Sequence, residues 1–348
     1  MERNSNIPIR NIYYMLSYAY QTLNLSEYKQ IGTEDFKNVK ELYAEILSIG
    51  ITVLIRGGLS KDYMSVEETP NVIKGKIDIN TTIKKNTLVN KKVAVVYDEF
   101  SEDILLNQII KGTLLYLAHS NKINHKMRKS FYGLLPYFTD VTAVELDLRL
   151  WKNVKYNRQN IRYQFIVDVC RYLYEELLFD ESSTSQIMKE LKDEQRLSSL
   201  YEKFIYAFFK RESDYKVSRP QIQWDVDDGF KEALPIMQTD LILQKDHKTL
   251  IADAKFYSEN MVARFEGGVA KQKSSNLYQI FSYINNWKKG PDEKVAGMLI
   301  YAKTTALNQP DHVYQVKCKQ IFVVSLDLQQ DFNDIKKSLL SYADQFFM

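Results

Sequence analysis

The stretch that decides the predicted fold is LPIMQTDLILQKDHKTLIADAKFY, residues 234–257. Two apolar segments flank the polar dipeptide Asp246-His247, and both have the aliphatic and β-branched content typical of strands. If that dipeptide is the two-residue turn of a hairpin, Asp240 and Asp253 are opposed, with Cβ atoms ~4.5–5.5 Å apart. Asp253 and Lys255 are two positions apart on one strand, so they share a face. The hairpin therefore predicts two carboxylates and one ammonium on one side of a mostly apolar strand pair.

This predicted cluster favours a metal site. Burying ionised groups without partners is costly, so such groups form ion pairs or bind metal. Two carboxylates held close together repel, and a divalent cation with oxygen ligands, Mg²⁺ or Mn²⁺, relieves that repulsion. Such a metal polarises a phosphoryl oxygen and lowers the pKa of a bound water. Lys255 would orient that water or stabilise charge on the phosphate. The alternative is an ordinary ion pair of Lys255 with either aspartate on a solvated sheet face, and spacing alone leaves it open.

Neighbouring helices offer further candidate residues for the same site. Glu202 lies in a predicted helix over 196–212, where it would add a third carboxylate; alternatively it is a surface charge. Gln279 and Tyr283 are four apart in a predicted helix over 273–288 and share a face, where they could contact a phosphate or position the lysine. Ordinary packing and solvent contacts are the alternative for both.

On either side of this hairpin, the sequence predicts two domains that mix helices and strands. The fold class is α/β, or α+β when the whole chain is considered. We expect an N-terminal domain over 1–155 and a second domain over 156–348, with a central mixed sheet flanked by helices. The N-terminal part is predicted to contain helices and a β segment, and the C-terminal part strands and helices. The predicted N-terminal helices are 10–24, 35–54, 102–119 and 124–134, and the β segment is 62–100. A helix at 158–179 and a loop or exposed helix at 180–195 come next, followed by strands near 213–224, 234–244, 249–257, 294–302 and 313–326 and a helix at 331–347.

Composition excludes several classes of protein. The 348 residues include 47 Lys or Arg and 44 Asp or Glu, which gives a formal net charge of +3. These proportions are typical of a globular protein. With two cysteines, a secreted disulfide scaffold is excluded and a cysteine-built zinc site is not expected. The start lacks a signal-peptide pattern, and no stretch approaches the ~18 apolar residues of a membrane span. We expect a cytoplasmic protein without membrane contact.

Basic runs indicate where nucleic acid would bind. The run at 149–163 interleaves cations with aromatic residues and contains no acid, a pattern that suits a phosphate backbone. Its cations are the predicted DNA contacts, to which Tyr283 is added: Arg149, Lys152, Lys155, Arg158 and Arg162. A second run of lysines at 74–92 would face a protein partner, and a solvated face is the alternative for either run. The tyrosines at 13, 14, 18 and 20 would contact the rest of the N-terminal domain or a partner, or simply pack.

The order of the candidate site residues resembles the PD-(D/E)xK nuclease superfamily. An acidic helix residue is followed by a strand Asp, then Asp-x-Lys, then Gln-x-x-x-Tyr on a helix, which is similar to the RecB-like branch. Six blocks in order resemble the McrC family, the nuclease subunits of McrBC modified-cytosine restriction systems, over nearly the whole chain. These blocks are IPIRNIYYMLSYAY at 7–20, RGGLSKDY at 56–63, IKGKIDI at 73–79, LYEKFIYAFFKRE at 200–212, DAKFY at 253–257 and NLYQIFSYI at 276–284.

This resemblance implies an endonuclease subunit that cleaves double-stranded DNA with Mg²⁺ or Mn²⁺. It implies catalytic roles for Asp240, Asp253 and Lys255, with Glu202 and Gln279 assisting, and metal binding by the three acids. The N-terminal domain would dock into a hexameric ring of McrB, an AAA+ GTPase, and stimulate GTP hydrolysis. The chain has no G-x-x-x-x-G-K-[ST] loop and no expected cofactor-binding residue of its own, so GTP would act only through that partner. A dimer of the nuclease domain in the full complex is also compatible with the resemblance.

Two other functions remain open from the sequence. One is a non-cutting activator that docks into the ring and stimulates GTP hydrolysis. The other is a stand-alone repair nuclease of the RecB-like branch, which would cut DNA without any GTPase.

Overall fold

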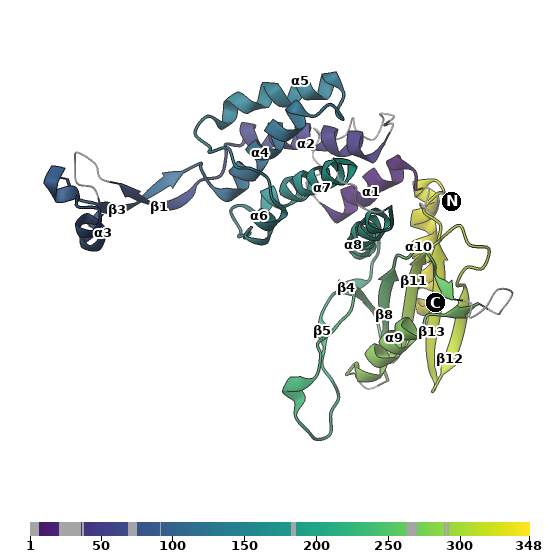
Figure 1. Ribbon diagram of the computed structural model, residues 1–348. Coiled ribbons are helices and arrows are strands. Elements are labelled where there is room, and N and C mark those ends of the chain that lie inside the picture. The colour runs from purple at the N-terminus through teal and green to yellow at the C-terminus, as the bar shows by residue number, and fades with distance from the viewer. Residues whose placement is uncertain are drawn as a thin grey trace. The chain divides into compact units, whose positions relative to one another are not determined.

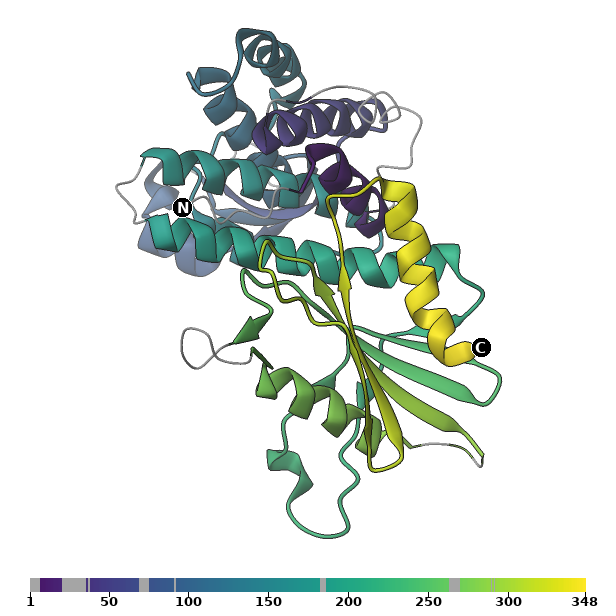
Figure 2. The same cartoon turned by 90° about the vertical axis from the view of Figure 1, so that its right-hand side faces the viewer.

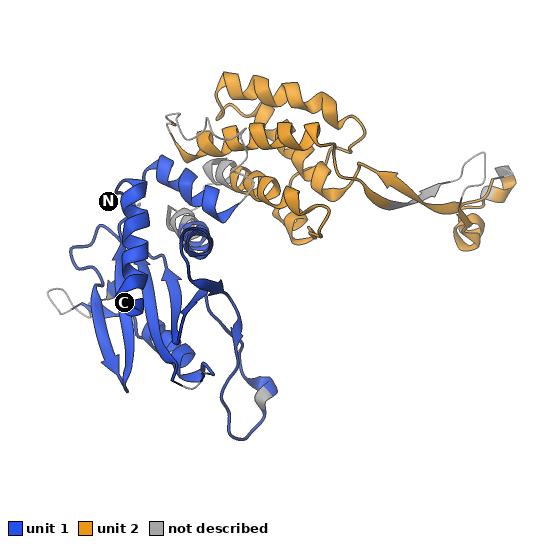
Figure 3. Ribbon diagram, turned by 180° about the vertical axis from the view of Figure 1, so that it is seen from behind, with its two compact units in different colours: residues 1–25, 184–348 blue, residues 26–183 orange. Residues whose placement is uncertain are grey.

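A computed structural model of the chain describes residues 7–20, 36, 38–68, 75–90, 92–181, 186–262, 270–288, 290 and 292–348. The chain forms two compact units (Figure 3). Residues 26–183 form the first, called the helical unit below; residues 1–25 and 184–348 form the second, called the sheet unit. Among the described residues, no helix is both long and apolar enough to cross a bilayer.

This division differs from the boundary predicted near residue 155. In the helical unit, α7 (Gln164–Glu181) packs against α2 (Val39–Arg56) and α4 (Leu105–His119), so the chain leaves this unit only after α7. In the sheet unit, α1 (Ile9–Ala19) packs against α8 (Gln186–Glu212), which brings the N-terminal helix to the C-terminal half. The helical unit also contains α5 (His125–Leu134), α6 (Leu148–Lys152) and the short 3₁₀ segments η5 (Leu135–Phe138) and η6 (Ile161–Tyr163).

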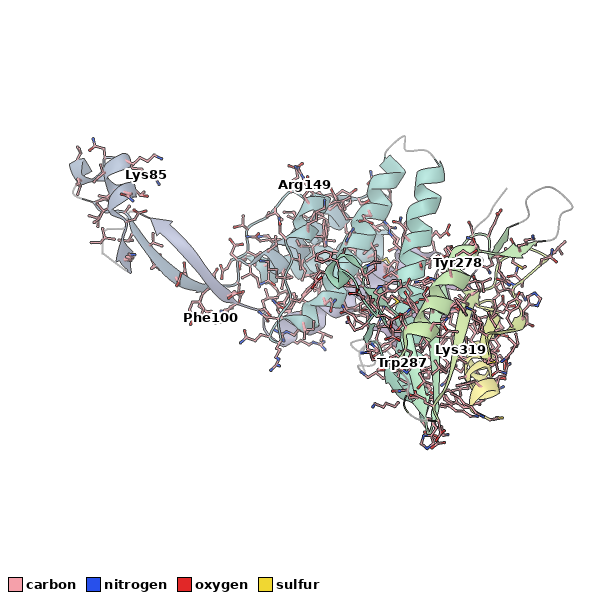
Figure 4. The ribbon with its side chains drawn as sticks, turned by 90° about the horizontal axis from the view of Figure 1, so that it is seen from below. Lys85, Phe100, Arg149, Tyr278, Trp287 and Lys319 are labelled. Carbon is pink, nitrogen blue, oxygen red and sulfur yellow. The ribbon has the colours of Figure 1, made fainter. Side chains whose placement is uncertain are left out.

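An arm of three strands extends from the helices of the helical unit (Figures 1 and 4). Its strands are β1 (Asp62–Glu68), β2 (Lys76–Ile77) and β3 (Val95–Ser101), in the order β1-β3-β2 with antiparallel pairing. The far end of the arm carries α3 (Ile79–Lys84) and η4 (Thr87–Asn90). The arm begins and ends where Asp62 pairs with Ser101.

The β segment predicted over 62–100 is interrupted by helical turns, because the stretch NVIKGKIDINTTI at 71–83, expected as a strand, is a helix in its second half. Residues 71–74 lie outside the described part of the chain, and Lys76–Ile77 is a strand. Helix α3 follows because Asp78 caps it: the Asp78 carboxylate accepts hydrogen bonds from the Thr81 backbone N–H (3.1 Å) and hydroxyl (2.6 Å). The cap outweighs the strand preference of the β-branched residues in this segment.

The sheet unit is built on a six-stranded mixed sheet, which confirms the predicted fold class. The strand order is β12-β13-β11-β8-β7-β4, with β11 parallel to both β8 and β13 and the other pairs antiparallel. The strands are β4 (Lys216–Ser218), β7 (Leu241–Lys245), β8 (Lys248–Lys255), β11 (Lys294–Ala302), β12 (His312–Val316) and β13 (Lys319–Leu326). Short strands β5 (Gln221–Ile222) and β6 (Met237–Gln238) pair with each other, as do β9 (Met261–Val262) and β10 (Lys271–Gln272), and η7 (Lys231–Ala233) is a 3₁₀ turn.

Helices α9 (Ser274–Asn286) and α10 (Phe332–Phe347) lie on opposite sides of this sheet (Figure 2). Helix α9 packs against β8 and β11 and buries Ile280 and Ile284 with Ile251 of β8. It approaches so closely that a Cβ at Gly297 would lie 2.7 Å from Ile280 Cγ1. This close packing holds α9 over the end of β8, where the candidate site lies.

Two tyrosines of α1, Tyr14 and Tyr18, pack inside the sheet unit. Tyr14 stacks on Phe332 of α10 with ring centroids 4.5 Å apart, and the Tyr18 hydroxyl donates to Glu212 of α8 at 2.7 Å. Helix α1 ends at Ala19, earlier than predicted, and residues 21–24 lie outside the described part. The acidic segment predicted as loop or exposed helix is helical from Gln186 onwards.

Candidate active site

The hairpin predicted from residues 234–257 is present with the predicted register. Leu241 pairs with Ala252 and Lys245 with Lys248, so Asp246-His247 forms the turn, and Asp246 adopts a φ of 51°. Aspartate is among the residues that tolerate this left-handed conformation. The same register sets Asp240, directly before β7, beside the end of β8. Its Oδ2 accepts a hydrogen bond from the Ala254 backbone N–H at 2.8 Å.

Asp253 and Lys255 lie on one face of β8 and form an ion pair between Asp253 Oδ2 and Lys255 Nζ. Asp253 is 2% exposed. Lys255 Nζ also donates to Gln279 Oε1 at 3.0 Å, and Gln279 Nε2 donates to the Tyr283 hydroxyl at 2.7 Å. That hydroxyl in turn donates to the Gln238 carbonyl at 2.9 Å. This chain of hydrogen bonds fixes the ammonium from α9, and Tyr283 itself is only 6% exposed.

On the other side of Asp240 lies an arginine that sequence reasoning missed. Arg219 Nη2 donates to Asp240 Oδ1 at 3.2 Å and lies 4.0 Å from Glu202 Oε2, while its Nε donates to the Thr239 carbonyl at 3.1 Å. Glu202 is therefore near the cluster, as predicted, but its nearest described cation is this guanidinium. Arg219 follows β4, which pairs with β7, and this long-range pairing has no signal in residue spacing.

The electrostatics of the cluster raise the pKa of two of its acids, Asp253 and Glu202. Burial and the neighbouring Asp240 carboxylate raise the pKa of Asp253 to about 7, although Lys255 opposes the shift. Burial and Asp240 also raise the pKa of Glu202, with Arg219 and Lys255 opposing. Burial lowers the pKa of Lys255, but the Asp253 carboxylate raises it more, so it stays above its ordinary value. The cluster therefore carries crowded negative charge, which a bound cation would relieve.

The donor set suits Mg²⁺ or Mn²⁺ held by two carboxylates. The described residues contain no group of three His, Cys, Asp or Glu side chains arranged to hold a metal. Mg²⁺, however, is commonly bound by one or two carboxylates, with waters and substrate phosphate completing its octahedron. Asp253 Oδ2 is buried and faces the Lys255 ammonium in an ion pair, so a carboxylate with a balancing cation lies beside Asp240. Asp240 and Asp253 thus fit the metal, and Glu202 is a weaker candidate because Arg219 lies beside it.

The predicted DNA-contacting cations all lie in the helical unit and are exposed. Arg149, at the surface in Figure 4, is paired with Asp147, which lies just before the acid-free run. Arg162 donates to the Gly58 carbonyl at 2.7 Å. The other members of the run are Lys152, Lys155 and Arg158.

A mixed sheet that presents Asp, Asp-x-Lys and a helix Gln-x-x-x-Tyr at one end of its strands defines a nuclease-like α/β protein. A family model described as McrBC 5-methylcytosine restriction system component matches residues 2–302. The chain is 30% identical, over 98% of its length and 98% of the relative's, to the "Type IV methyl-directed restriction enzyme EcoKMcrBC" of Escherichia coli K12. The chain belongs to this McrBC restriction-system family, which confirms the resemblance to McrC.

A solved structure supports the fold. It is a half-complex of Thermococcus gammatolerans McrB AAA+ hexamers with bound McrC, and it matches 99% of this chain and 77% of the other with a TM-score of 0.50 at 18% identity. At that identity the match bears on the fold alone.

Proposed function

We propose that this chain is the Mg²⁺-dependent endonuclease subunit of an McrBC-like restriction system. The observation that carries the proposal is the buried cluster of Asp240, Asp253 and Lys255, with Gln279 holding the lysine. An isolated surface ion pair would not need two carboxylates in a mostly apolar setting, where the second raises the pKa of the first. Membership of a restriction-system family supports DNA as the substrate of the cluster.

The chain's own residues would act as follows. Asp240 and Asp253 would hold one divalent cation, which when bound polarises a phosphoryl oxygen and activates a water. Lys255 would stabilise negative charge on the scissile phosphate or orient the attacking water, since its ammonium lies beside Asp253. Gln279 fixes the lysine, and Tyr283 fixes Gln279 through their hydrogen bond. Glu202 would assist from α8, and the exposed cations from Arg149 to Arg162 would contact the DNA backbone.

The partner in this proposal is an McrB-like AAA+ GTPase ring, and GTP would act only through it. The E. coli relative is named as an McrBC enzyme, and the solved relative is a complex of McrB hexamers with McrC. Support from this chain comes from the arm, whose far end exposes large apolar side chains beside Lys84 and Lys85. These side chains, called the arm tip, are Ile77 (42% exposed), Ile79 (65%), Ile83 (66%), Leu88 (57%) and Val89 (74%). Exposed apolar groups gathered at one place are typical of protein interfaces.

The test is DNA cleavage by Asp253→Asn in the presence of the partner and GTP. Removing a metal-binding carboxylate costs several kcal/mol of transition-state stabilisation, so we expect cleavage to fall at least ~1,000-fold. Asp246→Asn is the matched control: Asp246 lies in the turn of the same hairpin, and asparagine tolerates its φ of 51°. Full cleavage by Asp253→Asn would refute the site.

The same assay separates the alternatives. A chain that stimulates GTP hydrolysis while wild-type and Asp253→Asn proteins both leave DNA intact would be a non-cutting activator. Strong Mg²⁺-dependent cleavage without any GTPase would indicate a stand-alone repair nuclease.

A further inference from the structure

Arg219 occupies the position between two of the three acids of the cluster. Its guanidinium donates to Asp240 Oδ1 at 3.2 Å and lies 4.0 Å from Glu202 Oε2. It is also fixed through Nε, which donates to the Thr239 carbonyl at 3.1 Å. The Arg219 side chain is 38% exposed and that of Asp240 12%, so these contacts hold the guanidinium at the solvent-facing edge of the cluster. A second cation, Lys255, faces the other aspartate in the same way.

The charges of this cluster limit how many metal ions it holds. Three carboxylates, of Glu202, Asp240 and Asp253, and two cations, of Arg219 and Lys255, leave a formal charge of 2 − 3 = −1. One divalent cation brings the total to +1, which a single DNA phosphate neutralises. A second divalent cation would have to enter between Glu202 and Asp240, where the guanidinium already lies, and would leave a large excess of positive charge in a half-buried site.

We infer that Arg219 serves as a built-in cation at the Glu202–Asp240 side of the cluster, so that the site takes one divalent metal ion, between Asp240 and Asp253. This inference rests on the proposed nuclease site. Arg219 is a positioning residue in it: it orients Asp240 and satisfies Glu202, and it keeps a second ion out. Glu202 is then a partner of the arginine and not a metal ligand.

The test counts bound metal without any cleavage. Mn²⁺ titrated into the metal-free full-length protein is followed by electron paramagnetic resonance, which measures the free ion. We expect one Mn²⁺ per wild-type chain and none in the Asp253→Asn variant. In Arg219→Gln, which leaves Glu202 and Asp240 without their shared cation, we expect two, and adding Glu202→Gln to that variant should return the count to one.

Two further variants separate a charge effect from a structural one. Arg219→Lys keeps the positive charge and should still bind one Mn²⁺. Arg211→Gln, the matched control, removes an arginine of α8 that pairs with Glu212 at 3.6 Å, and should also leave the count at one.

The possible failures are distinguishable. Two Mn²⁺ per wild-type chain, or one in Arg219→Gln with native circular dichroism, would overturn the role of Arg219 and leave the nuclease proposal standing. No Mn²⁺ bound by the wild-type chain, or equal binding by wild-type and Asp253→Asn chains, would overturn the metal site itself and the inference with it.

Discussion

The cluster of the sheet unit and the arm tip of the helical unit depart from the usual distribution of side chains in opposite ways. At the cluster, charged groups are buried: Asp253 is 2% exposed and Asp240 8%. At the arm tip, apolar groups are exposed: Ile83 is 66% exposed and Val89 74%. Buried charges and clustered exposed apolar side chains are both uncommon in single chains, and both indicate a ligand or partner.

The kind of ligand differs because the chemistry differs. The charges of the cluster are held by an ion pair and by hydrogen bonds from the backbone and α9, so their geometry is fixed before any ligand arrives. The arm tip exposes apolar surface, which suits contact with the surface of another protein. The comparison therefore divides the function: cutting in the sheet unit and docking in the helical unit.

After Asp253→Asn, the largest effect is expected from Lys255→Met, which removes the ammonium and keeps the length of the side chain. Loss of a charge-stabilising group in a buried site should lower DNA cleavage by ~100–1,000-fold, with GTP hydrolysis by the partner unchanged. Lys248→Met, at the other end of the same strand, is the control and should cut normally. Cleavage near the wild-type rate by Lys255→Met would remove the lysine from the mechanism.

Val89→Asp at the arm tip is expected to impair stimulation of GTP hydrolysis and to leave the metal site intact. A charge introduced into an apolar interface should lower stimulation of the partner's GTP hydrolysis by ~10-fold or more. Binding of Mn²⁺ to the sheet unit should be unchanged. Ile161→Asp is the matched control, since Ile161 is 53% exposed in the same unit but outside the arm. Equal loss in both variants would show that the arm tip has no special role.

Metal affinity should depend on pH because the pKa of Asp253 is raised to about 7 in the metal-free protein. A proton and the metal compete for this carboxylate, so below that pKa the affinity for Mn²⁺ should fall by about tenfold per pH unit. Above it, the carboxylate is already ionised and the dependence should level off. Calorimetric titrations on both sides of the pKa measure this, and a flat profile would contradict the burial of Asp253 next to Asp240.

A smaller effect is expected from Tyr283→Phe, which removes the hydroxyl that accepts from Gln279 and donates to Gln238. Two hydrogen bonds are lost, but only the one from Gln279 supports the lysine; that bond is worth about 1 kcal/mol, so the rate of cleavage should fall ~5-fold with little change in DNA affinity. Tyr278→Phe is the control on the same helix, where Tyr278 is 69% exposed. A loss as large as that of Lys255→Met would give Tyr283 a direct catalytic role.

The sequence was sufficient for the local geometry of the site. A two-residue turn and strand alternation fix the register of a hairpin, so the convergence of Asp240, Asp253 and Lys255 could be predicted from residues 234–257 alone. The four-residue spacing of Gln279 and Tyr283 likewise predicted their shared face.

Long-range contacts could not be predicted in this way. Arg219 reaches Asp240 because the edge strand β4 pairs with β7, and α1 joins the sheet unit through contacts with residues far along the chain, such as Tyr14 with Phe332. Helix α3 was missed for a local reason: the strand preference of β-branched residues was given more weight than the capping aspartate, Asp78. That signal was present in the sequence.

The most direct test of the division between cutting and docking is one reaction with two readouts. The Asp253→Asn chain is mixed with the partner GTPase, GTP, Mg²⁺ and DNA, and GTP hydrolysis and DNA cleavage are measured together. We expect hydrolysis to be stimulated as by the wild-type chain while the DNA stays uncut. Cleavage at the wild-type rate, or loss of both activities in a variant that remains folded, would contradict the account.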